Sequence, residues 1–225
     1  MNRELIIDAK DGEVEIALLE EKSLVELHKE RSDQHYQVGD IYVGKVRKVM
    51  PGLNAAFVDV GYEKDAFLHY LDLGPQVRSL NKFVKLVMAG KAASVPIEKF
   101  TPEKDIDKTG KISNVLRTNQ HVVVQVEKEP ISSKGPRISS EISFAGRYIV
   151  LVPFSNRISV SQRIKSVDER NRLKRLMSSI KPNNFGIIIR TVAEGKLVAD
   201  LDSDLRSLLE RWSQLVRRLS NAKPP

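Results

Sequence analysis

Cysteine is absent from the 225-residue sequence, which excludes disulfide bonds, thiolate catalysis and cysteine-based zinc sites within this chain. No apolar run approaches the length that a membrane-spanning helix needs. The amino-terminal residues 1–15 carry acidic side chains where a secretory signal would need an apolar stretch. We therefore expect no membrane span, and a cytoplasmic location is the simplest interpretation.

A recognisable catalytic centre is also missing, because the sequence has neither a P-loop nor a nucleophile elbow. The histidines are scattered without the spacing of metal ligands; they are His28, His35, His69 and His121. Asp200, Asp202 and Asp204 lie close together, but the amino terminus of a helix attracts acids without any metal. We therefore predict no catalytic residue, no metal ligand and no cofactor in this chain.

The composition is that of a folding protein, with 41% hydrophobic and 29% charged residues in a chain long enough for one or two domains. Its net charge of +8 is unevenly distributed. Residues 131–225 contain 18 lysines and arginines against 8 acids, whereas residues 1–130 contain 19 against 21. A basic half of this kind favours a polyanionic partner such as nucleic acid, with a general solubilising charge excess as the alternative.

Three short strands are predicted in the first 30 residues, where turn-like KDG and EK separate ELIIDA, EVEIALLE and SLVELHKE. Three strands without a covering helix bury little, so we expect this piece to pack on something else. The polar stretch RSDQHYQVGD that follows is typical of a linker. Strand patterns return in IYVGKVRKV, NAAFVDV, DAFLHYL and NQHVVVQVEKE, with a short helix predicted in KFVKLVMAG. Short strands with glycine and proline turns favour a small barrel.

The basic half has a mixed pattern. We expect a hairpin in RISSEISFAGRYIVLVPF with FAGR at its bend, and strands in ISVSQRI and NFGIIIRT. A helix is predicted in SVDERNRLKRLMSSI, with Ser166 and Glu169 as a capping box and Pro182 beyond its end. A last helix is predicted from about Asp202, with one apolar face that indicates core packing or an interdomain seam. That face consists of Leu205, Leu208, Leu209, Trp212, Leu215, Val216 and Leu219.

One aromatic residue is unusually placed. If NAAFVDV is a strand, its side chains alternate, so Ala56, Val58 and Val60 share the natural core face. Ala55, Phe57 and Asp59 then share the face expected to meet water. An exposed aromatic on a barrel strand is the stacking platform of proteins that bind single-stranded nucleic acid. The alternation alone leaves open whether Phe57 stacks on bases or belongs to a strand buried on both faces.

Two long stretches resemble the ribonuclease E/G family, most closely its ribonuclease G type. GDIYVGKVRKVMPGLNAAFVDVGYEKDAFL is similar to the S1 domain of that family. SSKGPRISSEISFAGRYIVLVP and NFGIIIRTVAEGK are similar to its 5′-sensor segment. The first strands resemble the opening of its RNase H-like domain. The resemblance therefore implies a mixed α+β, mainly β protein, with the start of an RNase H-like domain at 1–36, an S1-type OB barrel at 37–128 and an α/β 5′-sensor region at 129–225.

The resemblance also implies which residues contact RNA. In the family, phenylalanines matching Phe57 and Phe67 line the RNA channel, and lysines matching Lys128 and Lys134 contact the strand. The pocket that binds the 5′-monophosphate of RNA matches Gly146, Val150, Arg190 and Thr191. The chemistry is suitable, because the planar guanidinium fork of Arg190 matches phosphate oxygens, and Thr191 adds a hydroxyl donor. We expect the bend at Gly146 to let a phosphate approach backbone N–H groups, and Val150 to pack on the terminal nucleotide.

The family's endoribonucleases cleave single-stranded RNA in RNA processing and decay. In them a downstream domain holds catalytic Mg²⁺ through aspartates, and a zinc-linker joins protomers. We expect this chain to be the RNA-binding and 5′-monophosphate-sensing amino-terminal portion of such an enzyme, unable to cleave RNA alone and lacking the family's main oligomerisation elements. Two alternatives stay open: a free-standing, non-catalytic S1-domain RNA-binding protein, and an interaction module whose last helix presents Trp212 to a partner.

Overall fold

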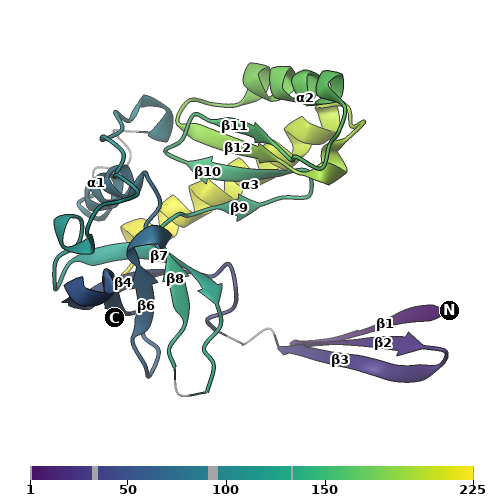
Figure 1. The fold of residues 1–225 in the computed structure, drawn as a ribbon, viewed down its shortest axis with the longest axis horizontal. Helices are drawn as coiled ribbons and strands as arrows, with labels where there is room; N and C mark the ends of the chain where they lie inside the picture. Colours follow the sequence, from purple (N-terminus) through teal and green to yellow (C-terminus); the bar gives the residue numbers. More distant parts are fainter. Residues whose placement is uncertain (1, 32–34, 91–95, 133, 225) are drawn as a thin grey trace. The chain divides into compact units, whose positions relative to one another are not determined.

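The computed structural model describes residues 2–31, 35–90, 96–132 and 134–224 (Figure 1). Its contacts divide the chain into two compact units, Met1–Gln37 and Val38–Pro225. Part of the linker expected at RSDQHYQVGD lies outside the described residues.

The first unit is an antiparallel three-stranded sheet of β1 (Arg3–Lys10), β2 (Glu13–Glu20) and β3 (Ser23–Arg31). The three predicted strands are therefore confirmed. Several of their apolar side chains are more than half exposed, namely those of Leu5, Ile6, Ile7, Leu24, Val25 and Leu27. This exposure agrees with the expectation that three strands alone bury little apolar surface.

A closed barrel begins the second unit. Its strands follow the order β4 (Ile41–Met50), β5 (Ala55–Asp59), β6 (Ala66–His69), β8 (Arg137–Ser139) and β7 (His121–Lys128). The predicted small barrel is confirmed, because alternate residues of these strands fill its interior. They include Val46, Ala56, Val58, Leu68, Val124, Val126 and Ile138. The fifth strand, β8, lies beyond residue 128, where we expected the barrel to end.

The excursion between β6 and β7 contains α1 (Val77–Met88) and short 3-10 turns at Ile97–Lys99 and Ile112–Asn114. The helix predicted in KFVKLVMAG is confirmed, but it begins earlier. Its first turns already bury Val77 and Leu80, so packing extends the helix beyond the apolar run visible in the sequence.

A four-stranded sheet follows, in the order β11 (Ile158–Val160), β12 (Phe185–Ile189), β10 (Ile149–Pro153) and β9 (Phe144–Ala145). Strands β9 and β10 form a hairpin within the predicted stretch, but its bend is at 146–148, because Phe144 and Ala145 of FAGR belong to strand β9. Arg137–Ser139, which we expected in the first arm, is strand β8 of the barrel. The helices of this region are α2 (Val167–Ile180) and α3 (Val198–Ser220). In Figure 1, α3 is the long yellow helix, which contacts β9, β10 and α1.

Helix α2 begins at the predicted cap without the full capping box, and helix α3 begins earlier than predicted. Ser166 caps α2 by accepting the N–H of Glu169 at 3.2 Å, but the Glu169 carboxylate binds Arg172 and Gly195 and does not complete a capping box. Helix α3 begins at Val198, four residues before the expected start, because Asp200 accepts the N–H of Leu197 and caps the helix there. Side-chain partners therefore set both starts.

One hydrophobic cluster joins the barrel side to the sheet side of the second unit. Trp212 of α3 lies at its centre and is only 6% exposed. Four phenylalanine rings surround the indole with centroids 5.7–6.3 Å away; they belong to Phe83, Phe144, Phe154 and Phe185. The apolar face predicted for the last helix is thus core packing. The alternative in which Trp212 is presented to a partner is wrong, because the indole is buried.

Candidate nucleic-acid interface

Phe57 and Phe67 form a pair on the outside of the barrel. They are direct partners across β5 and β6, with ring centroids 5.8 Å apart and an interplanar angle of 65°. Both are half-buried, whereas Ala56, Val58 and Leu68 on the opposite face are fully buried. Phe57 is therefore not a barrel-core residue. Ala55, which we expected on the same open face, is fully buried at the start of the strand.

Basic side chains continue this pair on both sides. Cross-strand pairing sets Lys48 opposite Phe57, Phe67 opposite Arg137, and Arg137 opposite Lys128. Directly opposite residues share a face of a sheet. The outside of the barrel therefore carries a row of five side chains, in the order Lys48, Phe57, Phe67, Arg137 and Lys128. All three basic side chains of this row are exposed. We call these five residues the barrel row.

The bases of the barrel row differ in their partners. Arg137 makes a bidentate bond to Asp72, at 3.0 and 2.9 Å, which raises the pKa of Arg137. No ion pair of the described residues involves Lys48 or Lys128, so their ammonium groups are available to a polyanion. Lys134, the fourth predicted RNA contact, lies outside the row in the loop between β7 and β8.

Sequence reasoning missed Lys48, Arg137 and His69. The alternation of β4 and β6 could have suggested Lys48 and His69, whose ring stacks on Phe67 at 6.4 Å. Nothing local could have suggested Arg137, because its place depends on the parallel pairing of β6 with β8, which are distant in sequence. Asp59 on the same face forms an ion pair with Arg47 at 2.5 Å and accepts the N–H of Gly61.

A second cluster lies at one end of the four-stranded sheet. Arg190 follows β12; its backbone N–H donates to Tyr148 at 2.8 Å, and its Nη1 donates to the carbonyl oxygen of Gly146 at 2.5 Å. Thr191 comes next, and its hydroxyl lies 2.9 Å from that of Ser161. The structure therefore brings Gly146, Arg190 and Thr191 together.

Val150 lies close to that end, on the face of the sheet opposite the core. It pairs with Ala145 on β9 and with Ile188 on β12, which in turn pairs with Ser159 on β11. Ile188 is 45% exposed, while its neighbours Ile187 and Ile189 are buried. Val150 and Ile188 thus form a small apolar surface just before Arg190.

The expectation for the bend at Gly146 needs correction. The N–H of Gly146 donates to Ile149 at 2.8 Å, and the N–H groups of the next three residues donate to the carboxylate of Asp204. These backbone donors are therefore already bound within the chain. A phosphate at this end of the sheet would meet the guanidinium of Arg190 and the hydroxyl of Thr191 instead.

Further positive charge surrounds this cluster. The guanidinium of Arg147 lies 5.4 Å from the ring centre of Tyr148, and the ammonium of Lys196 lies 5.8 Å from the same ring. Such cation–π contacts hold both bases beside the hairpin. Together with Arg190, they make the surroundings of the cluster favourable for an anion.

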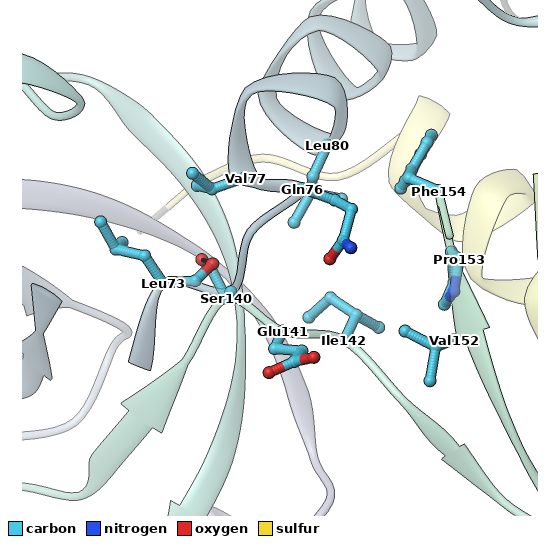
Figure 2. A pocket seen from close by; sticks show the side chains of 11 residues that line it. Leu73, Gln76, Val77, Leu80, Ser140, Glu141, Ile142, Val152, Pro153 and Phe154 are labelled. Atoms are coloured by element: carbon cyan, nitrogen blue, oxygen red, sulfur yellow. Dashed lines mark hydrogen bonds between the residues drawn. The ribbon is translucent and has the colours of Figure 1, made fainter. Parts of the chain in front are cut away.

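Other hollows of the second unit contribute less. A groove lined by Lys128, Ser139, Phe144, Ala145 and Arg211 extends from the end of the barrel row to β9. Figure 2 shows a small pocket between α1 and β10, lined mainly by apolar side chains such as Val77, Leu80 and Ile142. This pocket contains none of the predicted site residues.

Neither a metal-binding cluster nor a membrane-spanning helix occurs among the residues that the structure describes. Within residues 2–31, 35–90, 96–132 and 134–224, no group of three or more His, Asp or Glu side chains could hold a metal ion. No helix in the same ranges is long and apolar enough to cross a membrane.

Known proteins match this chain in sequence. Residues 143–225 match the model of the ribonuclease E/G family. Ribonuclease G of Salmonella typhimurium and that of Escherichia coli K12 are each 36% identical over 218 residues, which is 97% of this chain and 41% of the relative. Ribonuclease E of Nostoc is 38% identical over 192 residues, or 85% of this chain and 24% of the relative.

The fold is mixed α+β and mainly β, built around a closed five-stranded barrel, and the chain is similar along almost its whole length to these ribonucleases. The chain belongs to the ribonuclease E/G family. It spans about two fifths of the length of the curated ribonuclease G relatives that it matches.

Proposed function

We propose that this chain is the RNA-binding and 5′-monophosphate-sensing portion of a ribonuclease E/G-type endoribonuclease that acts on single-stranded RNA in RNA processing and decay. The observation that carries the proposal is the barrel row, in which two adjacent aromatic rings lie between exposed lysine and arginine side chains. Aromatic rings stack on nucleobases, and the lysine and arginine side chains beside them contact the phosphate backbone. We assign the barrel to an S1-type RNA-binding domain and residues from β9 onward to a 5′-sensor region.

In the proposed complex, Phe57 and Phe67 stack on bases, and Lys128 and Lys134 contact the strand. Base stacking is tolerant of sequence, because every base has a π-face. We therefore expect the barrel row to favour single-stranded RNA with unstacked bases and to have little preference for a particular nucleotide sequence.

The second cluster is proposed to bind the 5′-monophosphate. At the end of a buried strand, one hydrogen bond holds the backbone of Arg190, and a second, from Nη1 to the carbonyl oxygen of Gly146, holds its guanidinium. Thr191 adds a hydroxyl, and Val150 provides an apolar contact for the terminal nucleoside. Charge-assisted bonds from a fixed arginine to phosphate are among the strong hydrogen bonds of proteins. Gly146 contributes its carbonyl oxygen, which orients Arg190.

The test is fluorescence anisotropy with a short, 3′-labelled, A/U-rich RNA titrated with this chain. One version carries a 5′-monophosphate and the other a 5′-hydroxyl, and salt is fixed because phosphate contacts depend steeply on it. We expect both RNAs to bind, the monophosphate more tightly. No binding of either RNA would contradict the assignment of the barrel row, whereas equal binding would contradict the sensor alone.

A second candidate function is a free-standing RNA-binding protein, which the barrel row also supports. It predicts RNA binding without any preference for the 5′ end, so the same titration distinguishes it. Metal-dependent cleavage, zinc-mediated assembly and homo-oligomers are proposed for the whole enzyme, and no step above depends on them.

A further inference from the structure

One carboxylate of α3 holds the hairpin between β9 and β10. Asp204 Oδ1 accepts the N–H of Arg147 at 3.1 Å, and Oδ2 accepts those of Tyr148 at 2.8 Å and Ile149 at 3.1 Å. Consecutive backbone N–H groups of this kind make an anion-binding nest. Here the nest is filled by a side chain of the same protein.

The same carboxylate explains the glycine that precedes the nest. A Cβ atom at Gly146 would lie 2.6 Å from each carboxylate oxygen of Asp204, closer than real side-chain contacts. The φ angle of Gly146 is not among the positive values that would by themselves favour glycine. Gly146 therefore lacks a side chain because Asp204 occupies that space.

The hairpin in turn fixes Arg190. The carbonyl oxygen of Gly146 accepts Nη1 of Arg190, and the carbonyl oxygen of Tyr148 accepts its backbone N–H. Both acceptors belong to the bend that Asp204 holds. A continuous set of bonds thus connects a helix side chain to the guanidinium.

We propose that Asp204 is a positioning residue of the 5′-phosphate pocket. This inference rests on the proposed function above. The carboxylate of Asp204 holds the bend, and the carbonyl oxygen of Gly146 orients the side chain of Arg190. The guanidinium of Arg190 then binds the phosphate. Asp204 itself does not contact the ligand, because its oxygens face the backbone N–H groups.

Substituting Asp204 distinguishes a positioning role of its carboxylate from a purely electrostatic effect of its negative charge on the phosphate. A negative side chain near a phosphate repels it, so removing the charge alone would tighten binding of the monophosphate. Positioning predicts the opposite sign, because a loosened bend no longer holds Arg190. A matched control is available in Asp202, an acid on the same helix whose ion pair is to Arg206.

The experiment measures the ratio of affinities for the 5′-monophosphate and 5′-hydroxyl RNAs. We expect Asp204→Ala to lower this ratio about tenfold, as the loss of well-oriented charge-assisted bonds would do. Asp204→Asn, which keeps the size and one acceptor, should lower it less, and Asp202→Ala should leave it unchanged. Unaltered affinity for the 5′-hydroxyl RNA and an unaltered thermal midpoint report that each variant is folded.

The outcomes are separable. If the unsubstituted chain prefers the monophosphate and Asp204→Ala keeps or increases that preference, the positioning role is wrong and the sensor stands. If the unsubstituted chain has no preference, the sensor and the positioning role are both wrong, and the RNA-binding role of the barrel row stands. Should Asp204→Ala not fold, Asp204→Asn decides the question by the same ratio.

A double substitution provides an independent test. If Gly146 is glycine because of Asp204, then Gly146→Ala should reduce the ratio strongly alone but hardly at all in the Asp204→Ala background. If the ligand itself needs the space at Gly146, the additional loss should be equal in both backgrounds. Equal losses would overturn the inference.

Discussion

The rings of Phe57 and Phe67 lie 5.8 Å apart across β5 and β6, on the outer face of a barrel whose inner face is filled by aliphatic side chains. A ring pair in this position gains little from the core. Two adjacent rings offer a surface as long as a short run of bases, and Lys48 and Arg137 lie at its ends. Under the proposed function, this pair accounts for the aromatic residue beside an aspartate in NAAFVDV.

Phe57→Ala should weaken RNA binding about five- to 150-fold, because a base stacked on an aromatic ring is worth roughly 1–3 kcal/mol. The loss should be equal for RNAs with a 5′-monophosphate and a 5′-hydroxyl, because the ring lies on the barrel. Anisotropy titrations measure both.

The control for this prediction is Val167→Ala, which removes an apolar side chain of 65% exposure from the start of α2. It should leave RNA binding unchanged. An equal loss in both variants would show a general effect of surface truncation and contradict the stacking role.

Arg190→Ala should remove most of the preference for a 5′-monophosphate, lowering the affinity ratio by about tenfold or more, since hydrogen bonds to charged groups contribute roughly 1.5–3 kcal/mol. Thr191→Val should lower it less, because it removes one hydroxyl and its contact with Ser161. Affinity for the 5′-hydroxyl RNA should persist, since the barrel row is intact.

Arg206→Ala serves as the matched control, because Arg206 is an exposed arginine of α3 paired with Asp202. It lowers the net charge equally, so any general electrostatic loss appears in both variants. If Arg190→Ala lowered the affinity for both RNA ends by the same factor as Arg206→Ala, the assignment of the sensor would fail.

Glu169 should make stability depend on pH in the acid range. Arg172 donates two bonds to its carboxylate, at 2.6 and 2.7 Å, and Gly195 donates a third, which lowers the pKa of Glu169 to about 2. The unfolded chain binds this proton near the ordinary value of 4.5. The stabilisation is therefore fully present above that value and is lost as the pH falls toward 2.

Thermal midpoints measured at several pH values check this expectation. The unsubstituted chain should lose stability between about pH 4.5 and 2 more steeply than Glu169→Gln, which has no carboxylate to protonate. Asp202→Asn should behave like the unsubstituted chain, because its partner Arg206 is exposed and such pairs contribute little. Parallel curves for Glu169→Gln and the unsubstituted chain would contradict the prediction.

Local patterns predicted much of this fold. Alternation identified the barrel strands, the apolar face of the last helix identified its buried side, and Ser166 identified the start of α2, because each signal lies within a few residues. The same reasoning brought Arg190 and Thr191 to the end of a strand. The apolar face of the last helix was predicted to pack in the core, and Trp212 does so. The alternative, in which the helix presents Trp212 to a partner, was wrong.

Contacts between distant segments could not be predicted in this way. Arg137 joins the barrel row only because β8 pairs with β6, some seventy residues earlier. Asp204 was attributed to the start of a helix, a role that Asp200 has, while its bonds to the hairpin span more than fifty residues. A single sequence contains no pattern for such pairings, because they depend on how the elements pack.

Asn184 connects the segment before β12 to the excursion after α1, and its loss should destabilise the second unit. Its Nδ2 donates to the carbonyl oxygens of Ile97 and Phe100, both at 2.7 Å, and the residue is 6% exposed. Asn184→Ala leaves both carbonyl oxygens without this donor in a buried site. It also places alanine at a φ of 62°, a left-handed conformation that asparagine tolerates better.

We therefore expect Asn184→Ala to lower the free energy of unfolding by about 2–3 kcal/mol. Asn184→Asp should cost at least as much, because it turns a carboxylate oxygen toward two carbonyl oxygens, whereas Asn183→Ala at the exposed neighbouring position should cost little. Urea titrations followed by fluorescence of the single tryptophan report on this core directly, since Trp212 lies among its phenylalanines. Equal unfolding midpoints for Asn184→Ala and Asn183→Ala would mean that the two bonds of Asn184 do not hold the excursion to the sheet.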